Sequence, residues 1–329
     1  MSTEVKFLDL IEGSPDNLTI QDALGKCWQM VRGHEKIMVS VSGGADSDLM
    51  MDLFIRCGGK EKTTFVFHNT GLEYEATKRQ LRRLEEKYGV TIQMNPPVKP
   101  IPLSVREHGV PFWSKHVSEC IMRLQKHDFQ WEDGTLDELL EKYPRCKSAL
   151  RWWCNEWKLE SGAPSRLNIS WVWGLKEFLM ANPPAFKISP KCCHYAKKAP
   201  AEKYSKAGDF DLECVGVRKA EGGDRATVYS ACFSRGFGGP DKYRPLFWFS
   251  AEDKAVYDAH YGVEHSDCYT VWGMKRTGCA GCPFGKDFEE ELALAEKYEP
   301  KFHKAMLKVF GQSYDYTRQF LEFRKGLKE

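Results

Sequence analysis

A short run of small and polar residues behind an apolar segment is the part of this sequence best suited to chemistry. Ser42-Gly43-Gly44-Ala45-Asp46-Ser47 follows the β-branched run Ile37–Val41, and residues 48–54 have the apolar spacing of a helix. A strand, a glycine turn and a helix together aim backbone N–H groups and a helix N-terminus at phosphate. The two serine hydroxyls add donors, and Asp46 can hold Mg²⁺ or order the loop. The pattern predicts a nucleotide-phosphate site, with an ordinary glycine turn as the simpler alternative.

Two cysteine-rich strings could hold a metal centre. Lys191-Cys192-Cys193 offers two adjacent thiols, and Cys279-Ala280-Gly281-Cys282 presents two more from one tight loop. Four thiolates suit zinc or an iron–sulfur cluster. Adjacent cysteines on a regular element point apart, so both ligate one centre only with a special backbone. Cys268 is therefore a rival ligand and Cys154 a more distant one; a metal-free redox pair is the alternative.

The elements that must position these residues follow from hydrophobic periodicity. The expected elements are helices over 18–34 and 75–88 and strands over 37–41, 63–68, 90–94 and 212–217. Alternating strands and helices predict an α/β fold with a doubly wound parallel sheet. Ligands bind at the carboxyl ends of such strands, where both Ser42–Ser47 and Asn69–Gly71 would lie.

The remaining regions interrupt this pattern. Seven of the ten tryptophans lie between Trp113 and Trp173, within a segment expected to be a helical insertion. These rings are expected in a core, with stacking on a base as the alternative. Apolar stripes near the C-terminus favour helices that face a core or a homodimer interface. The expected domains are a nucleotide-binding part over 18–97 and 187–286, the insertion over 98–186, and C-terminal helices over 287–329.

Bulk composition is that of an ordinary globular protein, with 42% hydrophobic and 29% charged residues. No apolar run is long enough for a membrane span, and the N-terminus lacks a signal-peptide core, so we expect a cytoplasmic protein without a membrane partner. Twelve cysteines are then not expected to be structural disulfides. The net charge of +2 does not indicate nucleic-acid binding, but one local run is basic. Its lysines, which could meet nucleotide or nucleic-acid phosphates or form a solvated helix face, are at positions 187, 191, 197, 198, 203 and 206.

Several strings resemble one superfamily. Residues 42–47 resemble the PP-loop of ATP pyrophosphatases, which split ATP between the α- and β-phosphates. Residues 68–77 and 216–225 resemble stretches of adenylylsulfate and phosphoadenylylsulfate (PAPS) reductases, and residues 191–200 resemble the Cys-Cys string of the cluster-bearing adenylylsulfate reductases. Residues 276–284 resemble the cysteine-rich end of ATP-splitting members, among them the sulfur-transfer component of DNA phosphorothioation. The chain is identified as a PAPS reductase-like, PP-loop (adenine nucleotide alpha hydrolase-like) protein.

This resemblance implies site residues and cofactors. ATP with Mg²⁺ would be held by Ser40, Ser42, Gly43, Gly44, Asp46, Ser47, Asn69, Thr70, Gly71, Arg218 and Arg225. Catalysis would involve Asp46, Ser47 and Arg218, because arginine offers a planar fork for phosphate or sulfate oxygens. A [4Fe-4S] cluster, with zinc as the alternative, would be held by Cys192, Cys193, Cys279 and Cys282, or by a set that includes Cys268.

Two departures from the reductases bear on function. The sequence has no Glu-Cys-Gly-Leu-His string, which carries the reductase nucleophile, and its last cysteine is Cys282. Its PP-loop is intact, whereas the reductases usually degrade theirs. Both features favour an ATP pyrophosphatase that adenylylates a small molecule or a nucleic acid and supports cluster-dependent sulfur transfer, with a cysteine desulfurase or thioredoxin-like protein as donor. One alternative is a sulfonucleotide reductase whose nucleophile is Cys232 or Cys268; another is a nucleotide- and redox-sensing protein without turnover.

Overall fold

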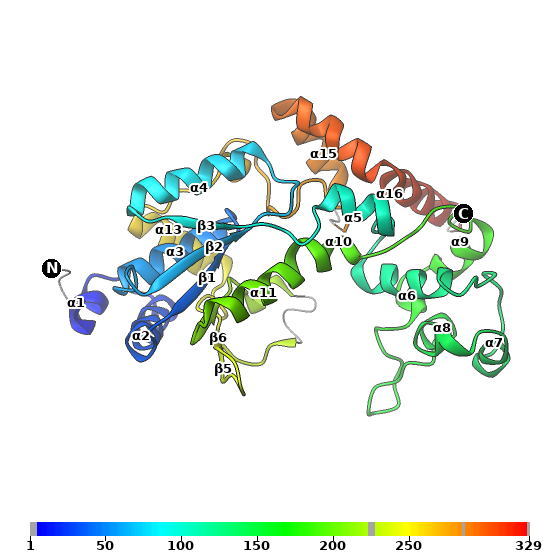
Figure 1. Ribbon diagram of the computed structural model, residues 1–329, viewed down its shortest axis with the longest axis horizontal. Helices are drawn as coiled ribbons and strands as arrows, with labels where there is room; N and C mark the ends of the chain where they lie inside the picture. Colours follow the sequence, from blue (N-terminus) through cyan, green and yellow to red (C-terminus); the bar gives the residue numbers. More distant parts are fainter. Residues whose placement is uncertain (1–4, 223–227, 285–286, 328–329) are drawn as a thin grey trace. The chain divides into compact units, whose positions relative to one another are not determined.

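The chain folds into two compact units (Figure 1). This computed structural model describes residues 5–222, 228–284 and 287–327. The first unit comprises Met1–Val98 and Ala196–Ala280, and the second comprises Lys99–Tyr195 and Gly281–Glu329. Residues 187–195 therefore cluster with the helical insertion and the C-terminal helices, whereas the domain boundaries expected from the sequence stay a prediction.

A six-stranded sheet forms the centre of the first unit. Its strands are β1 (Ile37–Val41), β2 (Thr63–His68), β3 (Ile92–Asn95), β4 (Leu212–Cys214), β5 (Phe233–Ser234) and β6 (Asp241–Tyr243). Their order is β3-β2-β1-β4-β6-β5, and every pairing is parallel except that of the short edge strand β5 with β6. The registers Val39↔Phe65 and Val39↔Cys214 place β1 between β2 and β4.

Helices cover both faces of this sheet. They are α1 (Phe7–Glu12), α2 (Leu18–Gly33), α3 (Ala45–Arg56), α4 (Glu75–Tyr88), α11 (Ala199–Gly208), α13 (Ala251–Tyr261) and α14 (Asp267–Thr270), with a 3-10 turn η4 at Lys219–Glu221. Successive strand side chains point to opposite faces. Val39 and Val41 accordingly join the main core with residues of α2, α3, α4 and α13, while Met38 and Val66 pack on the other face with Phe210 and Tyr204. The expected doubly wound α/β fold is confirmed.

The second unit is helical around an aromatic core. Its elements are α5 (Ile101–His108), α6 (Lys115–Gln125), α7 (Leu136–Lys142), η1 (Pro144–Cys146), α8 (Lys147–Trp153), η2 (Ile169–Trp171), α9 (Leu175–Ala181), α10 (Lys191–Cys193), α15 (Phe288–Tyr298) and α16 (Pro300–Gly326); a π-helical turn, η3 (His194–Lys198), follows α10. Trp152 and Trp153 are fully buried in this core, beside Phe178 and Phe320. Trp171 and Trp173 are exposed, so the tryptophan-rich segment serves a core only in part.

Element boundaries differ from the sequence expectations by a few residues. The helix α2 ends at Gly33 rather than residue 34, and β3 spans Ile92–Asn95 rather than residues 90–94. β4 ends at Cys214 rather than residue 217, where the chain leaves the sheet toward the candidate site. The C-terminal helical region is divided into α15, which ends at Tyr298, and α16, which begins at Pro300. The division lies at this point because proline removes a helix N–H and is favoured in a first turn.

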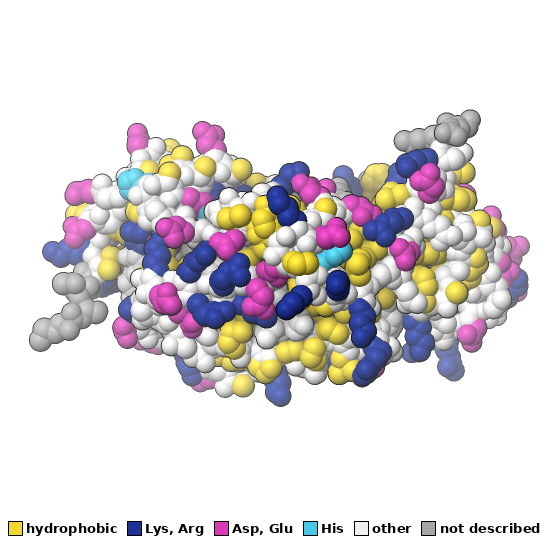
Figure 2. Space-filling view, turned by 90° about the horizontal axis from the view of Figure 1, so that it is seen from above, with side chains coloured by type: hydrophobic (Ala, Val, Ile, Leu, Met, Phe, Trp, Pro, Cys, Tyr) yellow, Lys and Arg dark blue, Asp and Glu magenta, His cyan; other side chains and the backbone are white. Residues whose placement is uncertain are grey.

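Lysine and arginine side chains lie among aspartate and glutamate side chains on the face shown in Figure 2. Among the described residues, no helix combines the length and apolar character that crossing a membrane requires.

Candidate active site

The order of the strands creates a switch point at the carboxyl end of β1. The chain passes from β1 to β2 on one side, whereas β4 pairs with the other side of β1. In open α/β sheets, ligands bind in the crevice where the strand order reverses in this way. Ser42 follows β1 at this edge and Val215 follows β4, so the glycine turn lies where a ligand is expected.

The glycine turn is closed by its own serines. The Ser47 hydroxyl donates to the Gly44 carbonyl at 2.7 Å and accepts from the backbone N–H of Ser42 at 3.1 Å. The Ser42 hydroxyl donates to Ser47 Oγ at 3.2 Å and accepts from the N–H of Gly44. Ser47 is buried, so its hydroxyl orders the loop in this state.

Gly43 is required by both conformation and space. Its φ of +66° lies in the left-handed region, which side chains with a Cβ rarely adopt. A Cβ there would lie 2.7 Å from Cγ2 of Thr77. The turn can therefore pack tightly against α4 only with glycine at this position.

Asp46 lies between two cations at the N-terminus of α3. Its Oδ2 accepts a hydrogen bond from Arg218 Nε at 3.0 Å, and Lys254 Nζ lies 3.3 Å from Oδ1. Oδ1 is buried and, within the part of the chain that the structure describes, accepts no hydrogen bond. Arg218 follows β4 and Lys254 belongs to α13, so three separate elements meet at this carboxylate.

A cavity of about 420 Å³ opens at this point and is strongly cationic. Its charged lining residues are Lys197, Arg218, Lys254, Lys275 and Arg276 against Asp46 and Glu221. Ser40, Ser42, Gly44 and Ser47 line it too, as do Tyr269 and Thr277. The Tyr269 hydroxyl is hydrogen-bonded to Thr277 Oγ1 at 2.9 Å. Such a surplus of positive charge near a helix N-terminus suits a polyphosphate.

A second cavity of about 260 Å³ shares part of this wall. Ser40, Ser42, Lys197, Arg276 and Thr277 line both cavities. The residues lining the second cavity alone include Val41, Phe67, His68 and Glu73. Apolar and aromatic side chains thus lie beside the cationic wall, as a ligand with a phosphate end and a ring would require.

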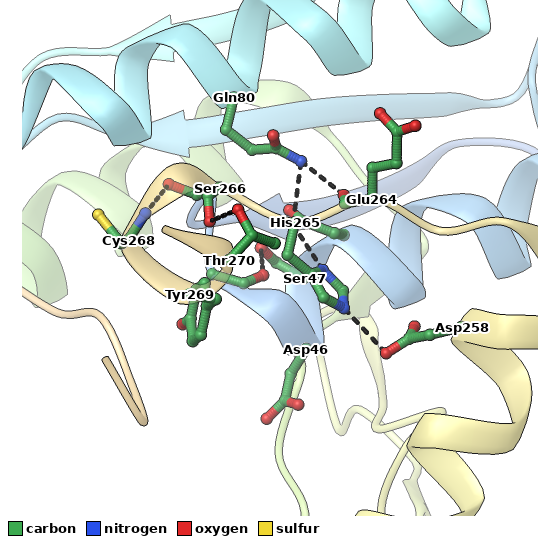
Figure 3. Close-up of polar contacts among 12 residues, drawn as sticks. Asp46, Ser47, Gln80, Asp258, Glu264, His265, Ser266, Cys268, Tyr269 and Thr270 are labelled. Atoms are coloured by element: carbon green, nitrogen blue, oxygen red, sulfur yellow. Dashed lines mark hydrogen bonds and ion pairs between the residues drawn. The ribbon is translucent and has the colours of Figure 1, made fainter. Parts of the chain in front are cut away.

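A charged network supports the turn from behind (Figure 3). His265 Nδ1 lies 3.1 Å from Oδ2 of Asp48, which is fully buried on α3, and Nε2 lies 2.8 Å from Oδ2 of Asp258 on α13. Gln80 on α4 donates to the same Asp48 oxygen at 3.1 Å and to the Glu264 carbonyl at 2.8 Å. The Asp46 carboxylate points away from this network (Figure 3).

The network favours a protonated imidazole. Burial disfavours the charged ring, but hydrogen bonds to Asp258 and Asp48 outweigh it and raise the pKa of His265 to about 9. Burial raises the pKa of Asp48, against the hydrogen bond from His265. A doubly donating imidazolium between two carboxylates ties α3, which carries Asp46, to α13, which carries Lys254.

The turn Asn69–Gly71, which was expected to hold ATP, is not part of the described lining of either cavity. The N–H of Gly71 donates to Oδ1 of Asn69 at 2.8 Å, and the buried Thr70 hydroxyl donates to Oε1 of Glu73 at 2.5 Å. Gly43 and these three residues are not among the described residues that line either cavity, although Glu73 lines the second. Their contact with a nucleotide stays a prediction, and Arg225 lies outside the described residues.

The five cysteines expected as ligands are divided between the units. Cys268 and Cys279 belong to the first unit, and Cys192, Cys193 and Cys282 to the second. Cys192 and Cys268 are buried and the others half-buried. Among the described residues, no three histidine, cysteine, aspartate or glutamate side chains form a group that could hold a metal ion. The cluster and its ligands stay a prediction.

Sequence reasoning missed several residues at the site. Lys254 and Lys275 lie outside the family-like sequence motifs. Only the folded chain brings Lys254 to Asp46 and both lysines to the cavity. Asp48 could have been noticed, because a carboxylate two positions after Asp46 on a buried helix needs a partner. His265 carried no comparable signal, since its role depends on contacts with α3 and α13.

Comparisons with known proteins find one matching domain family. Residues 36–136 match the phosphoadenosine phosphosulfate reductase domain. The resemblance to PAPS reductase-like proteins expected from the motifs is confirmed. The matched segment contains the turn after β1 and the two strands on one side of it.

Relatives include a reductase and an uncharacterized protein. The chain is 26% identical over 143 residues to adenosine 5′-phosphosulfate reductase 1 of Bacillus subtilis, covering 43% of this chain and 54% of the relative. It is 33% identical over 95 residues to an uncharacterized protein of Methanocaldococcus jannaschii, covering 29% and 16%. The chain thus spans about half or less of the length of these curated relatives.

Solved structures with similar chains are more distant. PAPS reductase from Candida auris, in a phosphate complex, has a TM-score of 0.43 at 13% identity, covering 85% of this chain and 98% of that one. The U34-tRNA thiolase of Methanococcus maripaludis, with its [4Fe-4S] cluster, has a TM-score of 0.40 at 12% identity, covering 92% and 78%.

Proposed function

We propose that the first unit binds ATP with Mg²⁺ and splits it between the α- and β-phosphates. The observation that carries this proposal is the cationic cavity at the intact glycine turn, where Arg218 and Lys254 flank Asp46. The surplus positive charge balances a polyphosphate, and the adjoining cavity beside Val41 and Phe67 has apolar surface for the nucleoside.

Different residues of the cavity would have different roles in the reaction. The first N–H groups of α3 and the cations of the wall hold the β- and γ-phosphates and stabilise the charge that develops on departing pyrophosphate. Arg218 lines the cavity, and its planar donors suit an oxygen of the α-phosphate that is transferred. An acceptor oxygen attacks the α-phosphorus, the bond to the β-phosphate oxygen breaks, and acceptor–AMP and pyrophosphate result.

Asp46 fits the requirement for a magnesium ligand. Its Oδ1 is buried and accepts no hydrogen bond from the residues that the structure describes, and a carboxylate oxygen is the kind of ligand that Mg²⁺ takes. Bound Mg²⁺ would supply charge neutralisation at the phosphate oxygens. Lys254 and Arg218 hold the carboxylate in position through their ion pairs.

We further propose that adenylylation activates the acceptor for sulfur insertion. The sulfur donor we propose is a cysteine desulfurase or a thioredoxin-like protein that carries a persulfide. AMP is a better leaving group than hydroxide, so the outer persulfide sulfur displaces it and forms a carbon–sulfur bond. A second thiol of the donor then attacks the inner sulfur, which leaves a disulfide on the donor and releases the thiolated acceptor.

Sulfonucleotide reduction is the second candidate, favoured by the domain match at residues 36–136. Its nucleophile would have to be an accessible thiol. Cys268 is fully buried, which disfavours attack by or on this sulfur, whereas Cys232 is half-buried. Cys232 is therefore the better candidate for that reaction.

A pyrophosphate-exchange assay distinguishes ATP cleavage from sulfonucleotide reduction. The purified protein is incubated with ATP, Mg²⁺ and labelled pyrophosphate, and label entering ATP is measured with and without candidate acceptors. Exchange, or acceptor-dependent pyrophosphate release, supports the proposed function. Sulfite release from a sulfonucleotide and a thiol reductant, without pyrophosphate chemistry, would replace it with the reductase reaction.

A further inference from the structure

We infer that the second unit carries a separate binding site for nucleotide phosphates, formed by Lys187, Lys191, Lys126 and Arg123 around a cavity on α6. The site lies wholly within this unit, and the proposed ATP site lies wholly within the first. The binding of a nucleotide phosphate at this second site does not depend on the proposed function. A role of this site in holding the acceptor substrate rests on the proposed function.

The cavity has the size and surface of a ligand site. Its volume is about 560 Å³, within the range of roughly 300–1,000 Å³ common for small-molecule pockets. Met122 and the buried Ile188 give it apolar surface, and the cations lie around that surface. A ligand with an apolar part and an anionic group matches this combination.

The charge at this cavity is not balanced by its acids. Glu119 pairs with Arg123 at 2.8 Å, and Glu107 pairs with Lys99. Within the described ranges, no carboxylate forms an ion pair with Lys126, Lys187 or Lys191. The surplus of positive charge also affects His108, which lines the cavity. Burial, and then the charges of Lys191 and Lys99, lower the pKa of this imidazole.

The backbone that carries Lys187 is firmly held. The Lys187 carbonyl accepts from the N–H of Val110 at 3.0 Å, and the side-chain amide of Gln125 binds the Phe186 carbonyl and the Ile188 N–H at 2.7 and 2.9 Å. Gly109, with a φ of +104°, permits this approach, since a Cβ there would lie 2.2 Å from the Lys187 carbonyl oxygen. The lysine is thus presented from an ordered segment.

The basic run of the sequence is therefore shared between two sites. Lys187 and Lys191 line the cavity of the second unit, whereas Lys197 lines both cavities of the first. Lys203 and Lys206 lie exposed on α11 and line none of these cavities. This division provides a matched control with the same loss of charge.

The test measures binding of a fluorescein-labelled single-stranded oligonucleotide of about ten nucleotides to the full chain by anisotropy, at about 50 and 200 mM salt. The variants are Lys187→Gln/Lys191→Gln and the control Lys203→Gln/Lys206→Gln. We expect the first to bind at least about tenfold more weakly, with a salt slope shallower by about 1.4, because two phosphate contacts are lost. The control should stay within about twofold of the parent.

Two further arms identify the source of the phosphate and keep this site distinct from the ATP site. Displacement of the oligonucleotide by uridine monophosphate assigns the site to free nucleotides, and no displacement assigns it to a strand. A Lys254→Gln variant, which removes a cation from the ATP cavity, should bind the oligonucleotide as the parent does, whether or not the parent cleaves ATP. Equal weakening in both double-lysine variants would overturn the inference, as would a parent that binds neither the oligonucleotide nor, by calorimetry, uridine monophosphate.

Discussion

Arg218 Nε lies 3.0 Å from Asp46 Oδ2, although 172 positions separate the two residues in the chain. Lys254 reaches the other oxygen of the same carboxylate from α13. A carboxylate held by two cations at the start of a helix is a preorganised group, because neither charge needs to be ordered when a ligand arrives. This relationship makes Asp46 the centre of the predictions that follow.

Replacing Asp46 by Asn should abolish ATP cleavage and leave the fold intact. The amide keeps the shape but loses the negative charge needed to hold Mg²⁺ and position the two cations, so pyrophosphate release should fall on the order of a hundredfold or more. Thermal unfolding checks the fold, and Glu86→Gln, an exposed acid on α4, is the matched control. Normal turnover in the Asn variant would remove Asp46 from the mechanism.

Lys254→Gln should weaken ATP binding through loss of a cavity cation. Lys254 both lines the cavity and pairs with Asp46, so we expect a KM for ATP raised by about tenfold, equivalent to roughly 1.4 kcal/mol. Steady-state pyrophosphate release gives KM and kcat separately. Lys60→Gln, which removes an exposed charge outside the cavity, should behave as the parent; equal effects would show that only net charge matters.

Gly43→Ala should destabilise the turn by about 1–3 kcal/mol, because a side chain is strained at this backbone conformation. The new Cβ would also meet Cγ2 of Thr77. Thr77→Ser removes that methyl group, so the double variant should recover part of the loss in chemical denaturation. Absence of any recovery would mean that backbone strain alone accounts for the effect.

Stability should fall as the pH rises from about 6.5 to 9, because the pKa of His265 is raised to about 9 in the folded protein. The protonated ring stabilises the fold fully below its unfolded pKa, and this stabilisation is lost as the pH passes through the folded value. The contribution is about 1–3 kcal/mol. Denaturation of the parent and His265→Gln across this range measures it. An unchanged pH dependence in the variant would show that other groups titrate.

Cys279→Ser tests the predicted cluster. Protein purified without oxygen should contain iron and sulfide and absorb broadly near about 400 nm, and the variant should lose most of this absorbance. Cys232→Ser, a half-buried cysteine outside the expected ligand set, should retain it. Zinc without iron in the parent would support a structural metal in place of the cluster.

Local sequence patterns were sufficient to predict the central part of the fold and the chemistry of its glycine turn. Ser42–Ser47 was recognisable because a buried strand, two glycines and a helix are local features with strong backbone preferences. The first strands and α4 were predictable for the same reason, since their hydrophobic periodicity reflects contacts with one sheet. The family resemblance followed from strings that retain their order along the chain.

Which distant charges meet at the glycine turn depends on how the helices pack. Lys254 and His265 act through contacts with α3 that depend on how α13 packs, and no local pattern records such packing. The same holds for the basic run, whose lysines line separate cavities in different units. Local sequence limits backbone conformation, whereas the position of a charge relative to a distant partner is set by long-range burial and strand order.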